Sequence, residues 1–223
     1  MKFLQEYLGY GGYVFSTNYD LLAYWVLMRN EAKNAVDGFG RDLETDLNTD
    51  DYIPKEDFEY SELRWGKHKD EQSVFYLHGT LPIFDTGTNI IKVEYDTEHF
   101  LLQNVKDRVE KNEYPIFVTA GNGLEKLTHI MHNKYLNFCY EKLCGIEGSL
   151  ISFGFNFGDY DTHIIDAINI ATKNGQKVKD KLWSVYIGVF SDEDYEHILN
   201  IQKNFKCKVV PYNARTANIW NNY

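Results

Sequence analysis

The sequence lacks several features that would assign its class at once. No apolar run approaches the roughly 18 residues that a membrane-spanning helix needs, and residues 1–13 show no uninterrupted apolar stretch or cleavage site typical of a secretory signal. Only three cysteines are present, Cys139, Cys144 and Cys207, and no two form a CxxC pair. We therefore expect reduced thiols in a cytoplasmic protein rather than a disulfide scaffold or a four-thiolate zinc site.

The sequence also has too few basic residues for a broad nucleic-acid interface. It holds 23 Lys and Arg against 33 Asp and Glu, a formal net charge of −10. An acidic protein can still bind an anionic cofactor through backbone N–H groups and helix ends. With 223 residues, 43% hydrophobic and 16% aromatic, the chain has ample material for one packed domain over residues 1–223.

Short apolar runs predict a parallel sheet. Most are continuously apolar rather than alternating, as in strands that are buried on both faces. The predicted strands are 12–17, 73–79, 115–121, 149–155, 182–190 and 208–213.

Helical patterns lie between most of these strands. The run 21–30 is apolar on nearly every side and is predicted to be a deeply buried crossover. Asp161 stands where it could cap one helix, and Ser191 with Asp194 resembles a capping box for another. The remaining helices are predicted at 97–111 and 123–143. This alternation favours an α/β fold: a Rossmann-like, doubly wound, mostly parallel sheet in three layers.

One region interrupts the alternation, and we interpret residues 31–72 as an insertion. Its part 42–59 holds eight acidic residues and one lysine, which favours an irregular, solvated segment. A surface loop and a lid over a binding site both remain open for it.

Polar residues follow the predicted strands at their carboxyl ends, where open parallel sheets bind ligands. Each has a structural alternative: Asp20 may only cap a helix, Asn18 may only satisfy loop backbone, and His78 may be a hydrogen-bonded core histidine. Their common edge nevertheless predicts a site. The residues are Thr17, Asn18, Asp20, His78, Gly79, Gly154, Asn156, Asp161 and Gly188.

An imidazole, an amide and a carboxylate in one cluster suit the cleavage of an N-glycosidic bond. That reaction develops positive charge on a sugar ring, which a carboxylate or amide oxygen stabilises. Histidine, with an unperturbed pKa of about 6.5, can activate water or a ribose hydroxyl near pH 7. His129 and His132 lack a third ligand at a diagnostic spacing, so no metal is expected.

Three blocks, STNYDLL, YLHG and GFNFGDYD, together resemble the sirtuin-like superfamily of NAD-binding proteins. The resemblance covers about residues 12–190 and is greatest to an uncharacterised bacterial sirtuin-like family, a domain of unknown function. It implies that Asn18 and Asp20 face the nicotinamide ribose and that His78 is the catalytic base. It also implies cofactor binding by Thr17, Gly79, Gly154, Asn156, Asp161 and Gly188, with Gly154 and Asn156 near the adenosine ribose or phosphates.

Two departures from that superfamily modify the expectation. The paired CxxC zinc motifs of protein-deacylating sirtuins are absent, which disfavours a deacetylase. The strand and Gly-rich phosphate loop that precede the Asn-x-Asp strand in such proteins are also not found, because YLGYGG at 7–12 has no strand before it. The expectation favours a truncated or shortened chain, and it leaves open a homo-oligomer or second chain that supplies this strand, or a rearranged fold.

The expected function is NAD glycohydrolase activity, with NAD depletion in bacterial antiphage defence as the role that the resemblance implies. The alternative is a catalytically inactive module that binds a nucleotide or another protein. NAD is the expected ligand or substrate, without metal, and neither a membrane nor nucleic acid is expected as a partner.

Overall fold

The computed structural model describes residues 2–30, 32, 34–40, 60–63, 65, 69–94, 100–118, 121–173 and 181–217. The chain divides into two compact units, Met1–Val118 and Thr119–Tyr223. Our expectation of one domain over residues 1–223 stays a prediction. No helix among the described residues is long and apolar enough to cross a membrane.

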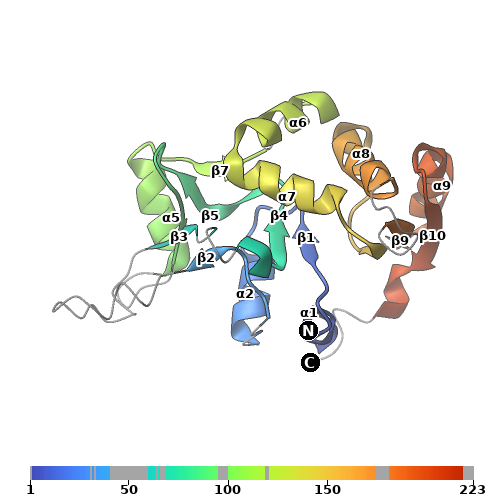
Figure 1. Ribbon diagram of the computed structural model, residues 1–223, viewed down its shortest axis with the longest axis horizontal. Coiled ribbons are helices and arrows are strands. Elements are labelled where there is room, and N and C mark those ends of the chain that lie inside the picture. The colour runs from blue at the N-terminus through green and yellow to red at the C-terminus, as the bar shows by residue number, and fades with distance from the viewer. Residues whose placement is uncertain are drawn as a thin grey trace. The chain divides into compact units, whose positions relative to one another are not determined.

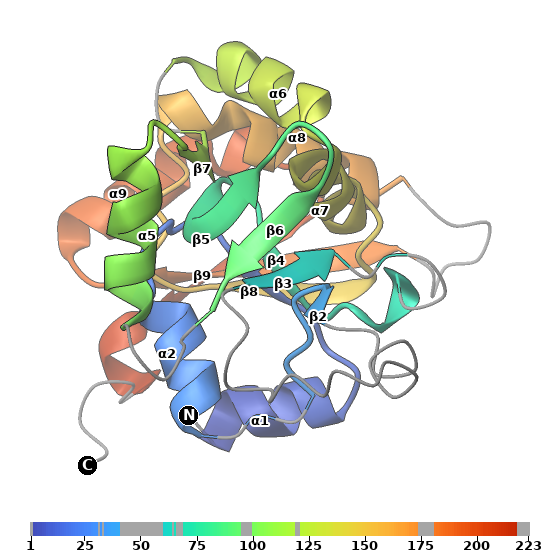
Figure 2. The ribbon, with the colours of Figure 1, turned by 90° about the vertical axis from the view of Figure 1, so that its left-hand side faces the viewer.

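The first unit contains two sheets. Strands β1 and β4 form a parallel pair, and five strands form an antiparallel sheet in the order β2-β3-β6-β5-β7 (Figure 2). The elements in chain order are α1 (Lys2–Gly9), β1 (Val14–Ser16), α2 (Leu22–Arg29), β2 (Phe39–Gly40), β3 (Tyr60–Leu63), η2 (Lys69–Glu71), β4 (Val74–Tyr76), β5 (Gly79–Asp85), β6 (Ile90–Val93), α5 (Leu101–Glu110) and β7 (Pro115–Phe117).

A tight turn after Asp85 joins β5 to β6 and makes them an antiparallel pair of the five-stranded sheet. The Asp85 carboxylate accepts a hydrogen bond from Gly87 N at 2.8 Å, and Thr86 N donates to Asn89 O at 2.9 Å. Pro82 falls where the β5–β7 register shifts, a position that tolerates a residue without an N–H group. The sheet and helix α5 enclose a buried cluster of Leu21, Phe84, Ile91, Val93, Leu101 and Val105.

A buried ion pair fixes one end of the predicted insertion to this sheet. Lys92 Nζ on β6 lies 2.7 Å from the Asp37 carboxylate, and both side chains are largely buried. Burial lowers the pKa of Lys92, but the attraction and hydrogen bond of Asp37 outweigh it, so that pKa is raised. The ends of the insertion thus form strands β2 and β3, while residues 42–59 lie outside the described residues.

The second unit is built on a parallel sheet in the order β10-β9-β8, of which Figure 1 labels β9 and β10 and Figure 2 labels β8 and β9. Its elements are α6 (Gly123–His132), α7 (Lys134–Cys144), β8 (Gly148–Ser152), η3 (Asp159–Asp161), α8 (Thr162–Ala171), β9 (Leu182–Val189), α9 (Asp192–Ile201), η4 (Gln202–Asn204), β10 (Lys208–Asn213) and η5 (Ala214–Ala217).

Side-chain caps set two helix boundaries in this unit. The predicted capping box of α9 is confirmed, because Ser191 Oγ accepts from Asp194 N while the Asp194 carboxylate accepts from Ser191 N. The single helix predicted over 123–143 is wrong. Asn133 ends α6 and caps α7 through hydrogen bonds from Tyr135 N and Leu136 N, so the chain forms two helices there.

The α/β class is confirmed, and all six predicted strands are present, although several are shorter than expected. The parallel pairing of β1–β4 and of β8–β10 agrees with the expected sheet type. The five-stranded antiparallel sheet does not, and it corrects the picture of one mostly parallel, doubly wound sheet. Part of its physical origin is the tight turn after Asp85, because strands joined by so short a connection must run antiparallel.

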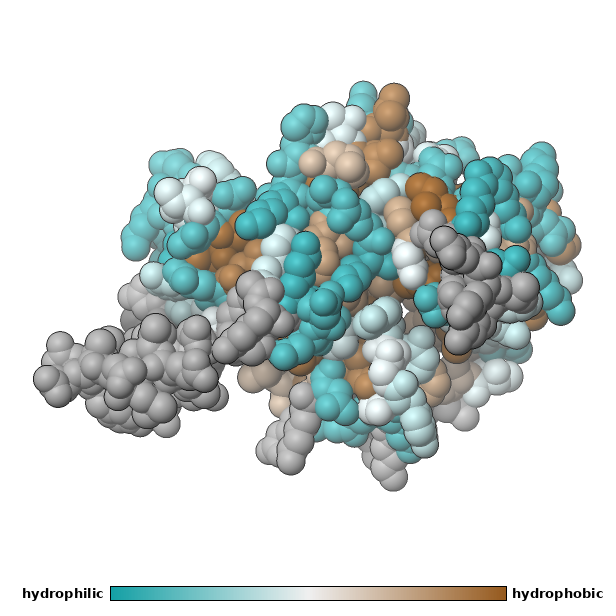
Figure 3. All heavy atoms as spheres, in the orientation of Figure 1, coloured by the Kyte–Doolittle hydropathy of each residue, from teal (hydrophilic) through white to brown (hydrophobic). Residues whose placement is uncertain are grey.

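Helix α2 is less buried than we predicted. Leu22, Trp25 and Met28, spaced three residues apart, are 46%, 50% and 61% exposed, so this stripe of α2 faces outward. The opposite side packs inward through Leu27 and through Tyr24 against the core cluster. Exposed apolar side chains also appear elsewhere, in small groups among hydrophilic ones (Figure 3).

Candidate functional site

The carboxyl ends of β1 and β4 form the first candidate site. In this parallel pair Ser16 lies opposite Tyr76, and Leu77 N donates to Ser16 O at 2.8 Å. Asn18 and His78 therefore occupy equivalent positions, each two residues beyond that pair. The prediction that neighbouring parallel strands carry these two residues is confirmed, while a crevice shared by their side chains stays a prediction.

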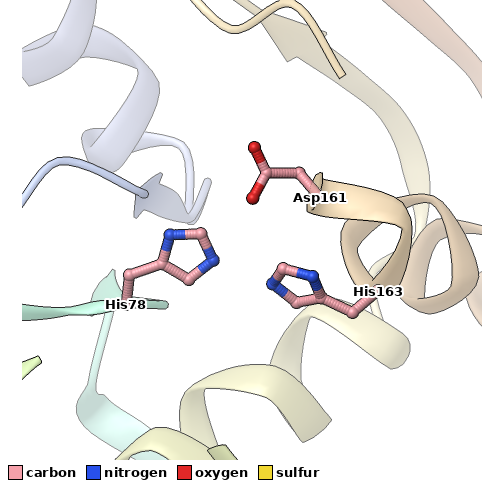
Figure 4. A group of neighbouring side chains, drawn as sticks. All are labelled: His78, Asp161 and His163. Atoms are coloured by element: carbon pink, nitrogen blue, oxygen red, sulfur yellow. The ribbon is translucent and has the colours of Figure 1, made fainter. Parts of the chain in front are cut away.

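His78 lies in the link between β4 and β5, where the chain leaves the parallel pair and enters the antiparallel sheet (Figure 4). It is only 4% exposed, and its carbonyl oxygen accepts a hydrogen bond from Val118 N at 3.0 Å. Gly79 has a φ of +80°, and a Cβ there would overlap the carbonyl oxygen of Ile116. Glycine is therefore required to turn the chain directly after His78.

Hydrogen bonds from both neighbouring strands hold the backbone of the loop after β1. Ser16 Oγ accepts from Asn18 N at 3.2 Å and lies 3.3 Å from Asn18 O. The Tyr19 carbonyl oxygen accepts from Leu81 N at 2.9 Å, and the Thr80 hydroxyl lies 3.3 Å from it. The loop that carries the predicted catalytic residues is thus fixed at several consecutive positions.

The side chains of this loop differ in their hydrogen bonds and in their exposure. The Asp20 carboxylate accepts from Leu22 N at 2.8 Å, which supports the helix-start alternative for this residue. The side chain of Asn18 is exposed and makes no hydrogen bond within the described part of the chain. Thr17 is half-buried beside it. Asn18 therefore presents an amide whose donors and acceptor are available to a ligand.

The loop after β8, in the second unit, carries two predicted cofactor-binding residues. Asn156 Oδ1 accepts from Gly158 N at 3.1 Å, and its carbonyl oxygen lies 2.8 Å from His197 Nε2 on α9. Gly154 has a φ of +68°, and a Cβ there would meet no atom of the described residues within 4 Å. The Asn156 side chain thus stabilises its own loop, and its Nδ2 group is the part left for a ligand.

Gly188 makes room for a tyrosine that joins the three strand ends of this unit. It lies opposite Tyr212 in the β9–β10 register, and a Cβ at Gly188 would lie 2.9 Å from the Tyr212 hydroxyl oxygen. That hydroxyl donates to Ser152 O on β8 at 3.0 Å. Burial raises the pKa of Tyr212 above its ordinary value. A packing role explains the glycine, and its predicted contact with a cofactor stays a prediction.

Asp161 forms an ion pair rather than the expected helix cap. Its carboxylate lies 2.7 Å from Lys126 Nζ on α6, the two side chains are 19% and 11% exposed, and no side-chain cap bond is made to α8. His163 follows in the first turn of α8, with a ring nitrogen within 4.8 Å of an Asp161 oxygen (Figure 4). Lys126 supplies the positive charge that balances this carboxylate, so charge balance here does not require a bound metal ion.

Three polar residues of these regions were given no role from the sequence: Thr80, Lys126 and His163. Thr80 lies inside an apolar run and carries no pattern of its own. Lys126 is one polar residue of an amphipathic helix, and its partner Asp161 lies 35 residues away. His163 was detectable in principle, because it follows Asp161 by two residues, and the structure shows that it is only 1% exposed.

The fold and these residues define an α/β protein with an imidazole, an amide and a carboxylate just beyond two paired parallel strands. The chain belongs to the family described as a domain of unknown function (DUF4917), which matches residues 1–220. No curated protein matches the chain.

Proposed function

We propose that this protein binds NAD and hydrolyses its nicotinamide N-glycosidic bond. The observation that carries the proposal is the pair of equivalent positions beyond β1 and β4, where a fixed loop presents the unbonded Asn18 amide and the partner strand carries His78. Ligands of parallel strands bind at such carboxyl ends. The sirtuin-like resemblance of the motifs around both residues supports NAD as the ligand.

The proposed reaction uses these groups in separate roles. The C1′–N bond to nicotinamide breaks, and a water oxygen forms the new bond to C1′. His78 accepts the proton of that water and returns it to solvent, while nicotinamide leaves with the bonding electron pair. The Asn18 amide oxygen and the Asp20 carboxylate lower the energy of the positive charge on the ribose ring.

The sirtuin-like resemblance assigns cofactor binding to further residues, and we keep these assignments as part of the proposal for each unit by itself. They are Thr17 and Gly79 in the first unit, and Gly154, Asn156, Asp161 and Gly188 in the second. NAD depletion in the cytoplasm of a phage-infected bacterium is the biological role that we attach to this activity, and a homo-oligomer stays a prediction.

The burial of His78 favours a second candidate, a module that binds NAD without hydrolysing it. At 4% exposure the imidazole has little surface for a substrate water. A binding module is stabilised by its ligand through mass action, by about 2.7 kcal/mol at a ligand concentration of 100 Kd. It releases no nicotinamide.

One experiment separates the two candidates. The purified chain is incubated with NAD, nicotinamide release is followed by chromatography, and the melting temperature is recorded with and without NAD. We expect release by the wild type and a loss of roughly 10²–10⁴-fold in His78→Ala, the range for removal of a general base.

His129→Ala is the matched control, since His129 is an exposed histidine of the second unit with no assigned role, and it should release nicotinamide at the wild-type rate. His78→Asn provides a polar replacement if His78→Ala melts early. Stabilisation by NAD without product identifies the binding module. Release by a folded His78 variant at the wild-type rate contradicts the proposed mechanism.

A further inference from the structure

Thr80 contacts the Asn18 loop through its side chain, although it belongs to β5 and lies 60 residues beyond Asp20 in the chain. It is the second residue of β5 and is 1% exposed. Its hydroxyl oxygen lies 3.3 Å from Tyr19 O and 3.3 Å from Asp20 O. A threonine hydroxyl has one proton, so it donates to the two carbonyl oxygens in turn or shares the proton between them.

We infer that Thr80 is a positioning residue that holds the Asn18–Asp20 loop in the conformation that binds the ligand. This inference rests on the proposed function, because the loop matters only if Asn18 meets NAD. Thr80 itself does not touch the substrate in this account. It acts through the carbonyl groups of Tyr19 and Asp20, the two consecutive residues that follow Asn18.

The Thr80 hydroxyl is not the only contact between this loop and β5 in the described part of the chain. The Leu81 N–H already donates to Tyr19 O at 2.9 Å, which keeps the loop beside β5. The hydroxyl adds a second, directional restraint, and fixed placement of a catalytic group is what such a restraint supplies.

Ser16 supplies the corresponding restraint from the other strand. Its hydroxyl bonds to the backbone of Asn18 at 3.2 Å, so the loop is held by one hydroxyl from β1 and one from β5. Asn18 lies between these two anchors and is the residue whose side chain is left unbonded in the described part of the chain. The arrangement restrains the backbone and leaves the amide available.

Thr80→Val tests the inference because valine keeps the shape and removes the hydroxyl. We expect kcat for NAD hydrolysis to fall about 10-fold or more with KM changed much less, since a small displacement of a positioned group costs up to about 10²-fold. Thr80→Ser retains the hydroxyl and should recover most of the rate. Thr86→Val is the matched control, because the Thr86 hydroxyl serves only the β5–β6 turn.

Hydrogen exchange of the peptide 17–22 gives a readout that does not depend on NAD. Exchange there should be faster in Thr80→Val than in wild type or Thr80→Ser, with the peptide 101–110 unchanged. If the wild type neither binds nor hydrolyses NAD, the proposed function fails, while this exchange result still decides whether Thr80 restrains the loop.

Two results overturn the inference. One is a loop that exchanges at the same rate in Thr80→Val and in wild type. The other is a Thr80→Val protein that melts earlier yet keeps the wild-type kcat and KM, which is the signature of a purely structural residue.

Discussion

The loop after β1 and the loop after β8 both follow parallel strands, but they use their asparagines differently. In the first loop, neighbouring hydroxyl and backbone groups hold the chain, and the Asn18 side chain is left exposed. In the second, the Asn156 side chain itself bonds to Gly158 N and stabilises the turn. The first arrangement leaves the whole Asn18 amide for a ligand, whereas the second leaves only the Nδ2 group of Asn156.

Glycine substitutions should give the largest difference between the two regions. Gly79→Ala places a methyl group against the Ile116 carbonyl oxygen at a positive φ, and we expect a loss of at least about 3 kcal/mol of unfolding free energy, or no folded protein. Gly154→Ala has the same sign of φ but open space, and should cost only about 1–2 kcal/mol. Urea denaturation followed by circular dichroism measures both. Equal losses would contradict the packing that we describe around Gly79.

Removing one charge of the Lys126–Asp161 ion pair in the second unit should lower the free energy of unfolding almost as much. Lys126→Met leaves the largely buried Asp161 carboxylate without its partner, which costs about 3 kcal/mol in comparable pairs. The double variant with Asp161→Asn should recover most of that loss. A double-mutant cycle in urea checks this, and additive losses would show that the two side chains do not interact.

A comparison of individual strands shows which parts of the fold can be predicted from the local sequence. Strand β10 was predicted at its observed bounds, 208–213, from the run KVVPYN, although its residues are half-buried or exposed. The antiparallel sheet was missed although its pair β5–β6 is a local hairpin. The apolar run 74–84 continues through Leu77 and His78, so the sequence does not show where β4 ends and β5 begins. Strand β2 was missed as well, because it has only two residues. A sequence pattern of period two cannot be recognised in so short a strand.

The candidate site was predictable in the same partial way. Asn18 and His78 could be found because they directly follow apolar strands that pair in parallel. The contacts of Thr80 and Lys126 could not, because each depends on a partner 35 or more residues away. Asp161 illustrates the competition: its position predicts a helix cap, but Lys126 offers its carboxylate a stronger, charge-assisted partner.

A smaller effect should appear at alkaline pH in the strand ends of the second unit. Burial raises the pKa of Tyr212 above 10.0, so the folded state holds this proton more tightly than the unfolded state. Its contribution to stability is complete below about pH 10 and is lost as the pH rises through the folded pKa. The drop in melting temperature between pH 8 and pH 11 should therefore be smaller in Tyr212→Phe than in wild type. An identical drop would show that Tyr212 is not the group responsible.

The rate of nicotinamide release by Asn18→Ala, measured beside its unfolding free energy, tests the central claim most directly. We predict a rate at least about 10-fold below wild type and an unfolding free energy within about 0.5 kcal/mol of it, since an exposed, unbonded side chain contributes little to the fold. Asn156→Ala should instead lose about 1 kcal/mol with its turn hydrogen bond. An Asn18→Ala protein that releases nicotinamide at the wild-type rate contradicts the account.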